Sequence, residues 1–95
     1  MDAENGLRRT CDILFDYLSL GDWNGCDQAI KYLNGYKSKV TSEVYNDKIY
    51  LLGNNICTLC KTVTNNAKKK EIFVYLDQVF ALIVDPKLFS DLVTE

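Results

Sequence analysis

The sequence predicts an all-α domain, a compact bundle of four to five amphipathic helices, because apolar residues recur at intervals of three and four along most of it. The composition fits a folded chain: of 95 residues, 47% are hydrophobic and 25% are charged, with 5 Gly and 1 Pro. These values lie near the globular average of about 45–50% apolar residues, and they exclude collagen-like and strongly disordered chains. We expect an N-terminal tail at residues 1–6 and a single helical domain over 7–95.

The first two helices are predicted to form a hairpin. Helical apolar spacing begins at Leu7, and Gly21 can adopt the left-handed backbone that ends a helix. The side chain of Asp22 can then accept hydrogen bonds from the free amides of a second helix that starts at Trp23. We expect Gly35 just past the end of that second helix, at the left-handed capping position.

A third helix is predicted after a polar connection at residues 36–40, with Thr41 or Ser42 as its cap. Its apolar face is Tyr45, Ile49, Leu52, Ile56, Leu59 and Val63. The turn-like triplet that starts at Gly53 leaves an alternative, an α+β fold with a β-hairpin around residues 48–63. The helix is favoured because the apolar stripe stays in register through Gly53, although glycine weakens a helix by about 1 kcal/mol.

A fourth helix follows the turn at residues 64–66. Its apolar positions are Ile72, Leu76, Val79, Phe80 and Ile83. Asp85 followed by Pro86 is typical of a helix start and predicts a short fifth helix that contains Leu88, Phe89, Leu92 and Val93.

Charge argues against nucleic acid as the main partner. The chain has 11 basic and 13 acidic residues, a net charge of −2, and a pI of about 5.0, whereas nucleic-acid-binding domains usually have a pI above about 9. The alternative function that stays open is a small helical nucleic-acid-binding protein. It would use the basic side chains of Arg8, Arg9, Lys68, Lys69 and Lys70.

Catalysis has little support in the sequence. There is no histidine, so the commonest general base and the commonest partner of a nucleophilic serine or cysteine are missing. The glycine-rich motifs that hold nucleotide phosphates and the hydrolase nucleophile motif are also missing. We therefore expect a protein that is not an enzyme and has no cofactor.

Four cysteines stand at positions 11, 26, 57 and 60. Cys57 and Cys60 have the spacing of a zinc-binding or redox pair, but a second pair of zinc ligands and a thioredoxin-like context are missing. We interpret both as small, half-buried apolar side chains and expect no metal site.

The first residues are acidic and lack the apolar core of a secretory signal, and no apolar stretch approaches the roughly 20 residues that cross a bilayer. Together with the unpaired cysteines, this predicts a cytoplasmic location, with the nucleus as the other intracellular option.

Aromatic residues provide the candidate binding face. The chain has 6 tyrosines, and Tyr32, Tyr36 and Tyr50 fall outside the main apolar stripes. Tyrosine is enriched at protein interfaces because it combines a large apolar area with a polar tip. Trp23 is expected to be mainly a core residue. The candidate partner-binding residues are Tyr17, Trp23, Tyr32 and Tyr36.

Residues 14–33, which read LFDYLSLGDWNGCDQAIKYL, resemble the helical hairpins of tetratricopeptide and CTLH-type domains. In those hairpins the first helix ends at Gly-Asp-aromatic, here Gly21 to Trp23, and the next helix carries a small residue three positions on. Here that residue is Cys26, where those families usually have alanine, and no second copy follows. The resemblance implies scaffolding or peptide binding by the helix faces.

These observations together predict a non-catalytic protein–protein interaction module, of the adaptor, chaperone-like or antagonist kind. We expect it to bind another protein or a second copy of itself, as a homodimer, through its helix faces.

Overall fold

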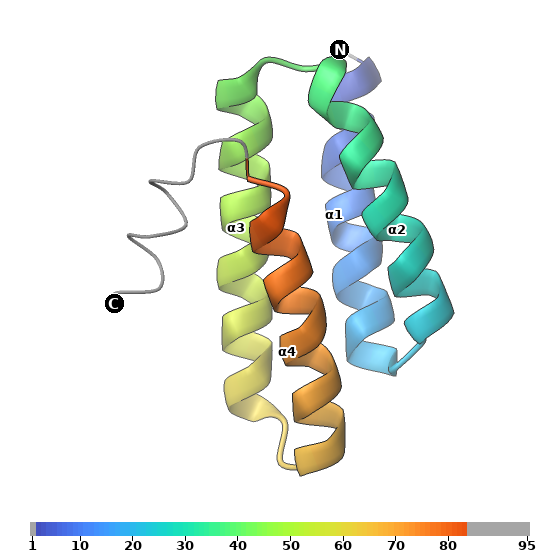
Figure 1. Cartoon of the computed structure of the whole chain (residues 1–95), viewed down its shortest axis with the longest axis vertical. Helices are drawn as coiled ribbons and strands as arrows, with labels where there is room; N and C mark the ends of the chain where they lie inside the picture. Colours follow the sequence, from blue (N-terminus) through green and yellow to red (C-terminus); the bar gives the residue numbers. More distant parts are fainter. Residues whose placement is uncertain (1, 84–95) are drawn as a thin grey trace.

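The computed structural model describes residues 2–83, and in that range the chain folds into a bundle of four α-helices with one short 3-10 helix (Figure 1). The elements in chain order are α1 (Asp2–Leu20), α2 (Trp23–Gly35), η1 (Tyr36–Ser38), α3 (Ser42–Thr62) and α4 (Asn66–Ala81). The prediction of an all-α fold is confirmed. Residues 48–63 lie within or directly at the end of one continuous helix, so the alternative β-hairpin is wrong.

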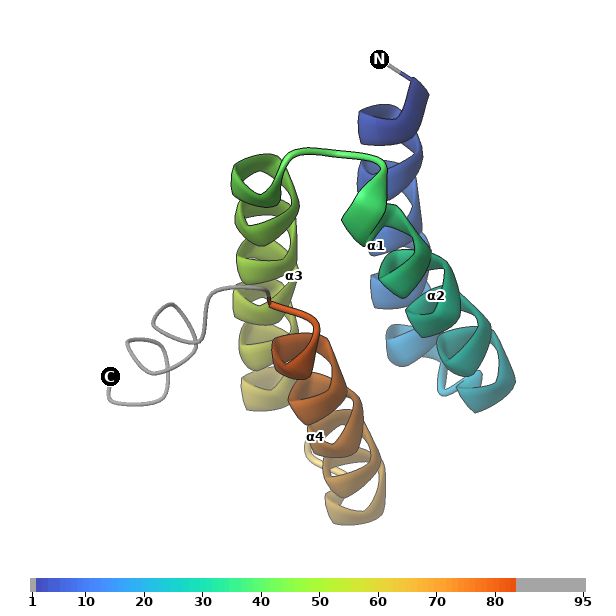
Figure 2. The same cartoon turned by 45° about the horizontal axis from the view of Figure 1, so that its top comes forward.

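The bundle is built from two antiparallel helix hairpins. Helices α1 and α2 form the first and α3 and α4 the second, and η1 connects them at one end (Figures 1 and 2). Helix α1 packs against both α2 and α3, and α4 packs mainly against α3. The outer side of the first hairpin is therefore free of the second hairpin.

The core collects the apolar stripes of all four helices. Its largest fully buried side chains are Tyr45, Leu7, Leu14, Leu18, Leu33, Ile49, Ile56, Ile72 and Val79. Burying an aliphatic side chain of this size contributes roughly 1.5–3 kcal/mol, so this core is the main stabilising contribution to the fold.

Helix starts follow the predicted capping chemistry. The backbone amide of Gly25 donates to Asp22 Oδ1 (3.0 Å), and that of Val44 donates to Thr41 Oγ1 (3.3 Å). These bonds satisfy amides that have no partner inside the helix. Between α1 and α2, Gly21 adopts a φ of +77°, the left-handed conformation expected for it.

Two boundary predictions are wrong. Helix α1 begins at Asp2, so residues 2–6 are helical and not a tail. Acidic Asp2 and Glu4 in its first turn favour the helix start by interacting with the helix dipole. Gly35 is the last residue of α2 with a φ of −66°, because the chain continues directly into η1 instead of reversing there. The fifth helix predicted from Asp85 lies outside the described residues.

Across residues 2–83, no helix combines the length and the apolar content needed to cross a membrane.

Candidate functional site

A shallow groove runs between α1 and α2 on the outer side of the first hairpin. Its volume is about 290 Å³. The side chains that line it are Thr10, Ile13, Tyr17, Gly25, Gln28, Ala29, Tyr32 and Tyr36. The α1 members are spaced by three and four residues, which places them on one side of that helix.

Small residues let the two helices and their tyrosines approach closely. The ring of Tyr17 covers Gly25, where a Cβ atom would lie 2.6 Å from the ring. In the same way the ring of Tyr36 covers Gly6. Both tyrosines are half-buried: Tyr17 holds α1 against α2, and Tyr36 holds α1 against η1. Each of them also lines the groove.

The groove lining carries no charged side chain. Two of its apolar side chains project into solvent: Ile13 is 40% exposed and Tyr32 is 65% exposed. Ala29 between them is buried. The result is an uncharged floor of small residues between raised apolar ridges, a shape that accepts apolar side chains of another helix.

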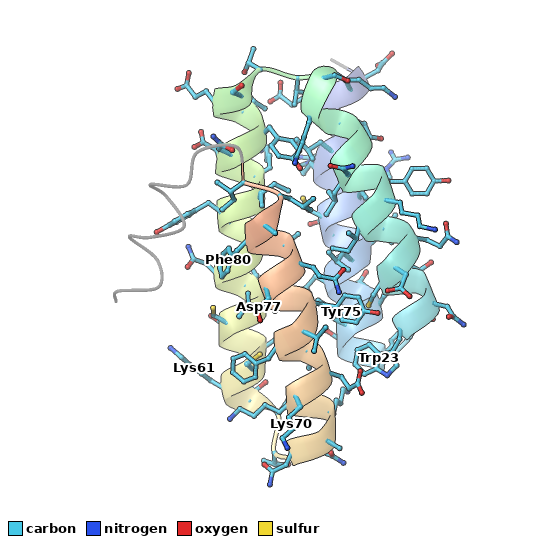
Figure 3. All side chains as sticks on the ribbon, in the orientation of Figure 1. Trp23, Lys61, Lys70, Tyr75, Asp77 and Phe80 are labelled. Atoms are coloured by element: carbon cyan, nitrogen blue, oxygen red, sulfur yellow. The ribbon has the colours of Figure 1, made fainter. Side chains whose placement is uncertain are left out.

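Three of the four candidate partner-binding residues meet in this groove, namely Tyr17, Tyr32 and Tyr36. The fourth, Trp23, lies on the side of α2 that faces α4, where its ring stacks on Tyr75 with a centroid distance of 5.7 Å (Figure 3). The structure therefore gives Trp23 a packing position between the hairpins, in agreement with the prediction that it is mainly a core residue.

Tyr75 also joins α4 to α2 through its hydroxyl. The hydroxyl donates to Asp27 Oδ1 at 2.5 Å and lies 3.2 Å from the backbone oxygen of Trp23. Burial and the hydrogen bond to Asp27 raise the pKa of Tyr75. A second bond between the hairpins runs from Lys68 Nζ to the backbone oxygen of Ser19 at 2.7 Å. These polar contacts fix one end of the bundle.

Sequence patterns missed five residues of the groove: Thr10, Ile13, Gly25, Gln28 and Ala29. Ile13 is close in sequence to the buried residues Cys11 and Leu14 of α1, but its own side chain is exposed. The sequence signal for its position was its spacing of three residues after Thr10 and four before Tyr17, which continues a second stripe.

A second groove of about 380 Å³ lies between α1 and α3. Its floor is apolar and includes Cys11 and Leu52, but charged side chains also line it: Arg8, Asp12, Asp16 and Lys48. Covering this groove would remove four charges from water, and each would need a partner of opposite sign to offset the desolvation cost. It is less suited to a general protein contact than the uncharged groove.

The basic residues of the alternative function are not brought into one patch. Arg8 and Arg9 lie in the first half of α1, whereas Lys68 is bonded to Ser19 near the last residue of that helix. Ten residues separate Arg9 from Ser19, which corresponds to about 15 Å along a helix.

All four cysteines are free thiols. Cys60 is buried and Cys57 is partly exposed, in agreement with their interpretation as packing residues. Burial raises the pKa of Cys11 and of Cys26 to about 12, so both thiols stay protonated and unreactive at neutral pH. Within the described residues, no three side chains of the metal-binding types cluster closely enough to hold a metal ion.

Comparison with known proteins gives no relative: no family model, no curated protein and no solved structure matches the chain.

Proposed function

We propose that this chain is a non-catalytic protein-binding module of the adaptor, chaperone-like or antagonist kind, and that the groove between α1 and α2 is its binding face. The observation that carries the proposal is the meeting of Tyr17, Tyr32 and Tyr36 with exposed Ile13 in one uncharged groove. Exposed tyrosine and aliphatic side chains around small residues are the features that protein interfaces bury at their centres.

The energetics of covering this groove also support the proposal. The exposed parts of Ile13 and Tyr32 would be removed from water, and the hydrophobic effect stabilises that burial by about 25 cal/mol per Å² of apolar surface. No charged side chain of the lining has to lose its hydration. The hydroxyl groups and the amide of Gln28 can exchange bonds with water for bonds with a partner.

We propose that the partner binds with a helix that presents an apolar stripe. The exposed side chains of Ile13 and Tyr32 border a groove of small residues, and a row of apolar side chains from another helix fits into such a groove. The four free cysteines fit work in a reducing compartment, and we place this activity in the cytoplasm.

The experiment is retention of proteins by the immobilised full chain from an extract of cells that express it. The test variant is Ile13→Ser/Tyr32→Ser. The matched control is Leu51→Ser/Phe73→Ser, because Leu51 and Phe73 are 56% and 45% exposed and lie outside this groove. We expect wild type and control to retain the same proteins and the groove variant to lose them. Equal retention by the groove variant would overturn the proposal.

A further inference from the structure

The outer side of α1 carries a stripe that no other element of the described chain covers completely. Its members follow one another at intervals of four, three, four and three: Gly6, Thr10, Ile13, Tyr17 and Leu20. This is the spacing by which one helix packs along another in a coiled-coil seam. Leu20 is 79% exposed and Ile13 is 40% exposed, so the stripe ends in the most exposed large apolar side chain of residues 2–83.

Two opposite charges flank the exposed Ile13 along α1 at nearly equal distances, and one of them, Asp16, also lines the groove between α1 and α3. Arg9 is four residues before it and Asp16 is three residues after it, and both are exposed. No ion pair joins either of them to another residue in the range 2–83. Along α1 the order is therefore positive Arg9, apolar Ile13 and negative Asp16. If a second copy of the helix runs in the opposite direction, each positive charge faces a negative one.

We propose that the partner of this face is a second copy of the chain, with the two α1 helices packed antiparallel about a twofold axis at Ile13. This inference rests on the proposed function and specifies its partner. In this arrangement Ile13 packs against its own copy, and each Arg9 lies opposite the partner's Asp16. A twofold interface requires such self-complementarity, because the same surface is used on both sides.

The ends of the stripe also match. Antiparallel packing about Ile13 brings Leu20 to the level of the partner's Gly6, since the two are seven residues either side of the axis. The ring of Tyr36 covers Gly6, so the leucine meets this half-buried ring there. Tyr32 of α2 stands at the level of Thr10, because Tyr36 packs on Gly6 and Tyr17 on Gly25. It is 65% exposed and extends the contact at the edge of the α1 pair.

The test is sedimentation equilibrium of the full chain over the micromolar to millimolar range. Wild type is expected to form a dimer, and Ile13→Asp is expected to be monomeric. Arg9→Asp and Asp16→Arg each place like charges opposite each other and should weaken the dimer by at least about tenfold. The double variant Arg9→Asp/Asp16→Arg exchanges the two charges and should recover the dimer to within about threefold of wild type.

Matched controls are Lys61→Asp and Asp77→Arg, which make the same charge changes on exposed positions of α3 and α4 (Figure 3). They should leave the dimer unchanged, and circular dichroism should show the same helix content in all variants. A wild-type chain that stays monomeric overturns this inference, and so does a double variant as weak as the single ones. If the chain is a monomer but still retains another protein through Ile13 and Tyr32, only the inference that the partner is a second copy is overturned. If the chain neither dimerises nor retains another protein, the proposed function is overturned as well.

Discussion

The ring of Phe80 in α4 lies directly on the backbone of Gly53 in α3, in the space that a Cβ atom of residue 53 would occupy. Both residues are buried. This contact explains why a residue that weakens helices stands in the middle of a continuous 21-residue helix. The close approach of α3 and α4 depends on it.

Replacing Gly53 by alanine is expected to destabilise the fold. Alanine favours the helix by about 1 kcal/mol, but its methyl group overlaps the Phe80 ring, and overpacking of this kind costs about 1–3 kcal/mol. Urea unfolding should therefore show a lower free energy of unfolding for Gly53→Ala.

Gly35→Ala is the control for this prediction. Gly35 has a helical φ of −66°, and no other side chain lies within 4 Å of the place that a Cβ atom would take there. Alanine at this position should raise the free energy of unfolding by about 0.5–1 kcal/mol. A stabilised Gly53→Ala variant would contradict the role assigned to the Phe80 contact.

Two buried tyrosines should respond in opposite ways to the loss of their hydroxyl groups. Tyr75→Phe removes the bond to Asp27 and should cost about 1–2 kcal/mol, because a charged acceptor loses its donor. The hydroxyl of Tyr45 is buried without a partner among the described residues, so Tyr45→Phe should cost nothing or stabilise by up to about 1 kcal/mol.

The measurement is again urea unfolding, with Tyr32→Phe as the control at an exposed position. Its hydroxyl is open to water in both the folded and the unfolded state, and the expected change is close to zero. Equal losses for Tyr75→Phe and Tyr45→Phe would contradict the assignment of the two hydroxyl groups.

Thiol modification should distinguish the four cysteines. Cys57 is the partly exposed one, while Cys11, Cys26 and Cys60 are buried and their pKa values are raised by burial. Mass spectrometry after brief alkylation of the native protein at neutral pH should find the label on Cys57. Denatured protein should be labelled at all four positions, and rapid labelling of Cys26 in native protein would contradict the structure.

Stability should fall at alkaline pH. The pKa of the Cys11 and Cys26 thiols rises from 9.0 to about 12 in the fold because of burial. The folded chain therefore holds these protons more tightly than the unfolded chain, so the stabilisation is complete below about pH 9 and is lost as the pH rises toward about 12. Unfolding at several pH values should show this decline, and Cys11→Ala/Cys26→Ala should flatten it more than Cys57→Ala.

Much of the fold follows from local patterns in the sequence. The apolar stripes locate all four described helices, and Asp22, Gly21 and Thr41 determine the helix boundaries by short-range capping that depends only on neighbouring residues. The patterns could not show why glycine stands at position 53, because the explanation is its contact with Phe80, which lies 27 residues later in the chain. The start of α1 was missed for a similar reason, since Gly6 is covered by Tyr36 of η1.

The candidate site was predictable only in part. Excess tyrosines pointed to Tyr17, Tyr32 and Tyr36, which line one groove, but composition could not show that Trp23 is stacked on Tyr75 of another hairpin. Nor could it show that Ile13 is exposed, because an isoleucine beside a buried stripe is equally typical of a wide core face. Which of two neighbouring stripes faces solvent depends on where α3 packs against α1.

Self-association through the outer side of α1 and the groove beside it can be tested residue by residue, with a series of amide NMR spectra of the full chain on dilution from the millimolar to the micromolar range. We expect chemical-shift changes that cluster on α1 around Ile13 and on α2 around Tyr32, with little change around Leu51 or Phe73. Spectra that do not change with concentration, or changes centred on α3 and α4, would contradict this expectation.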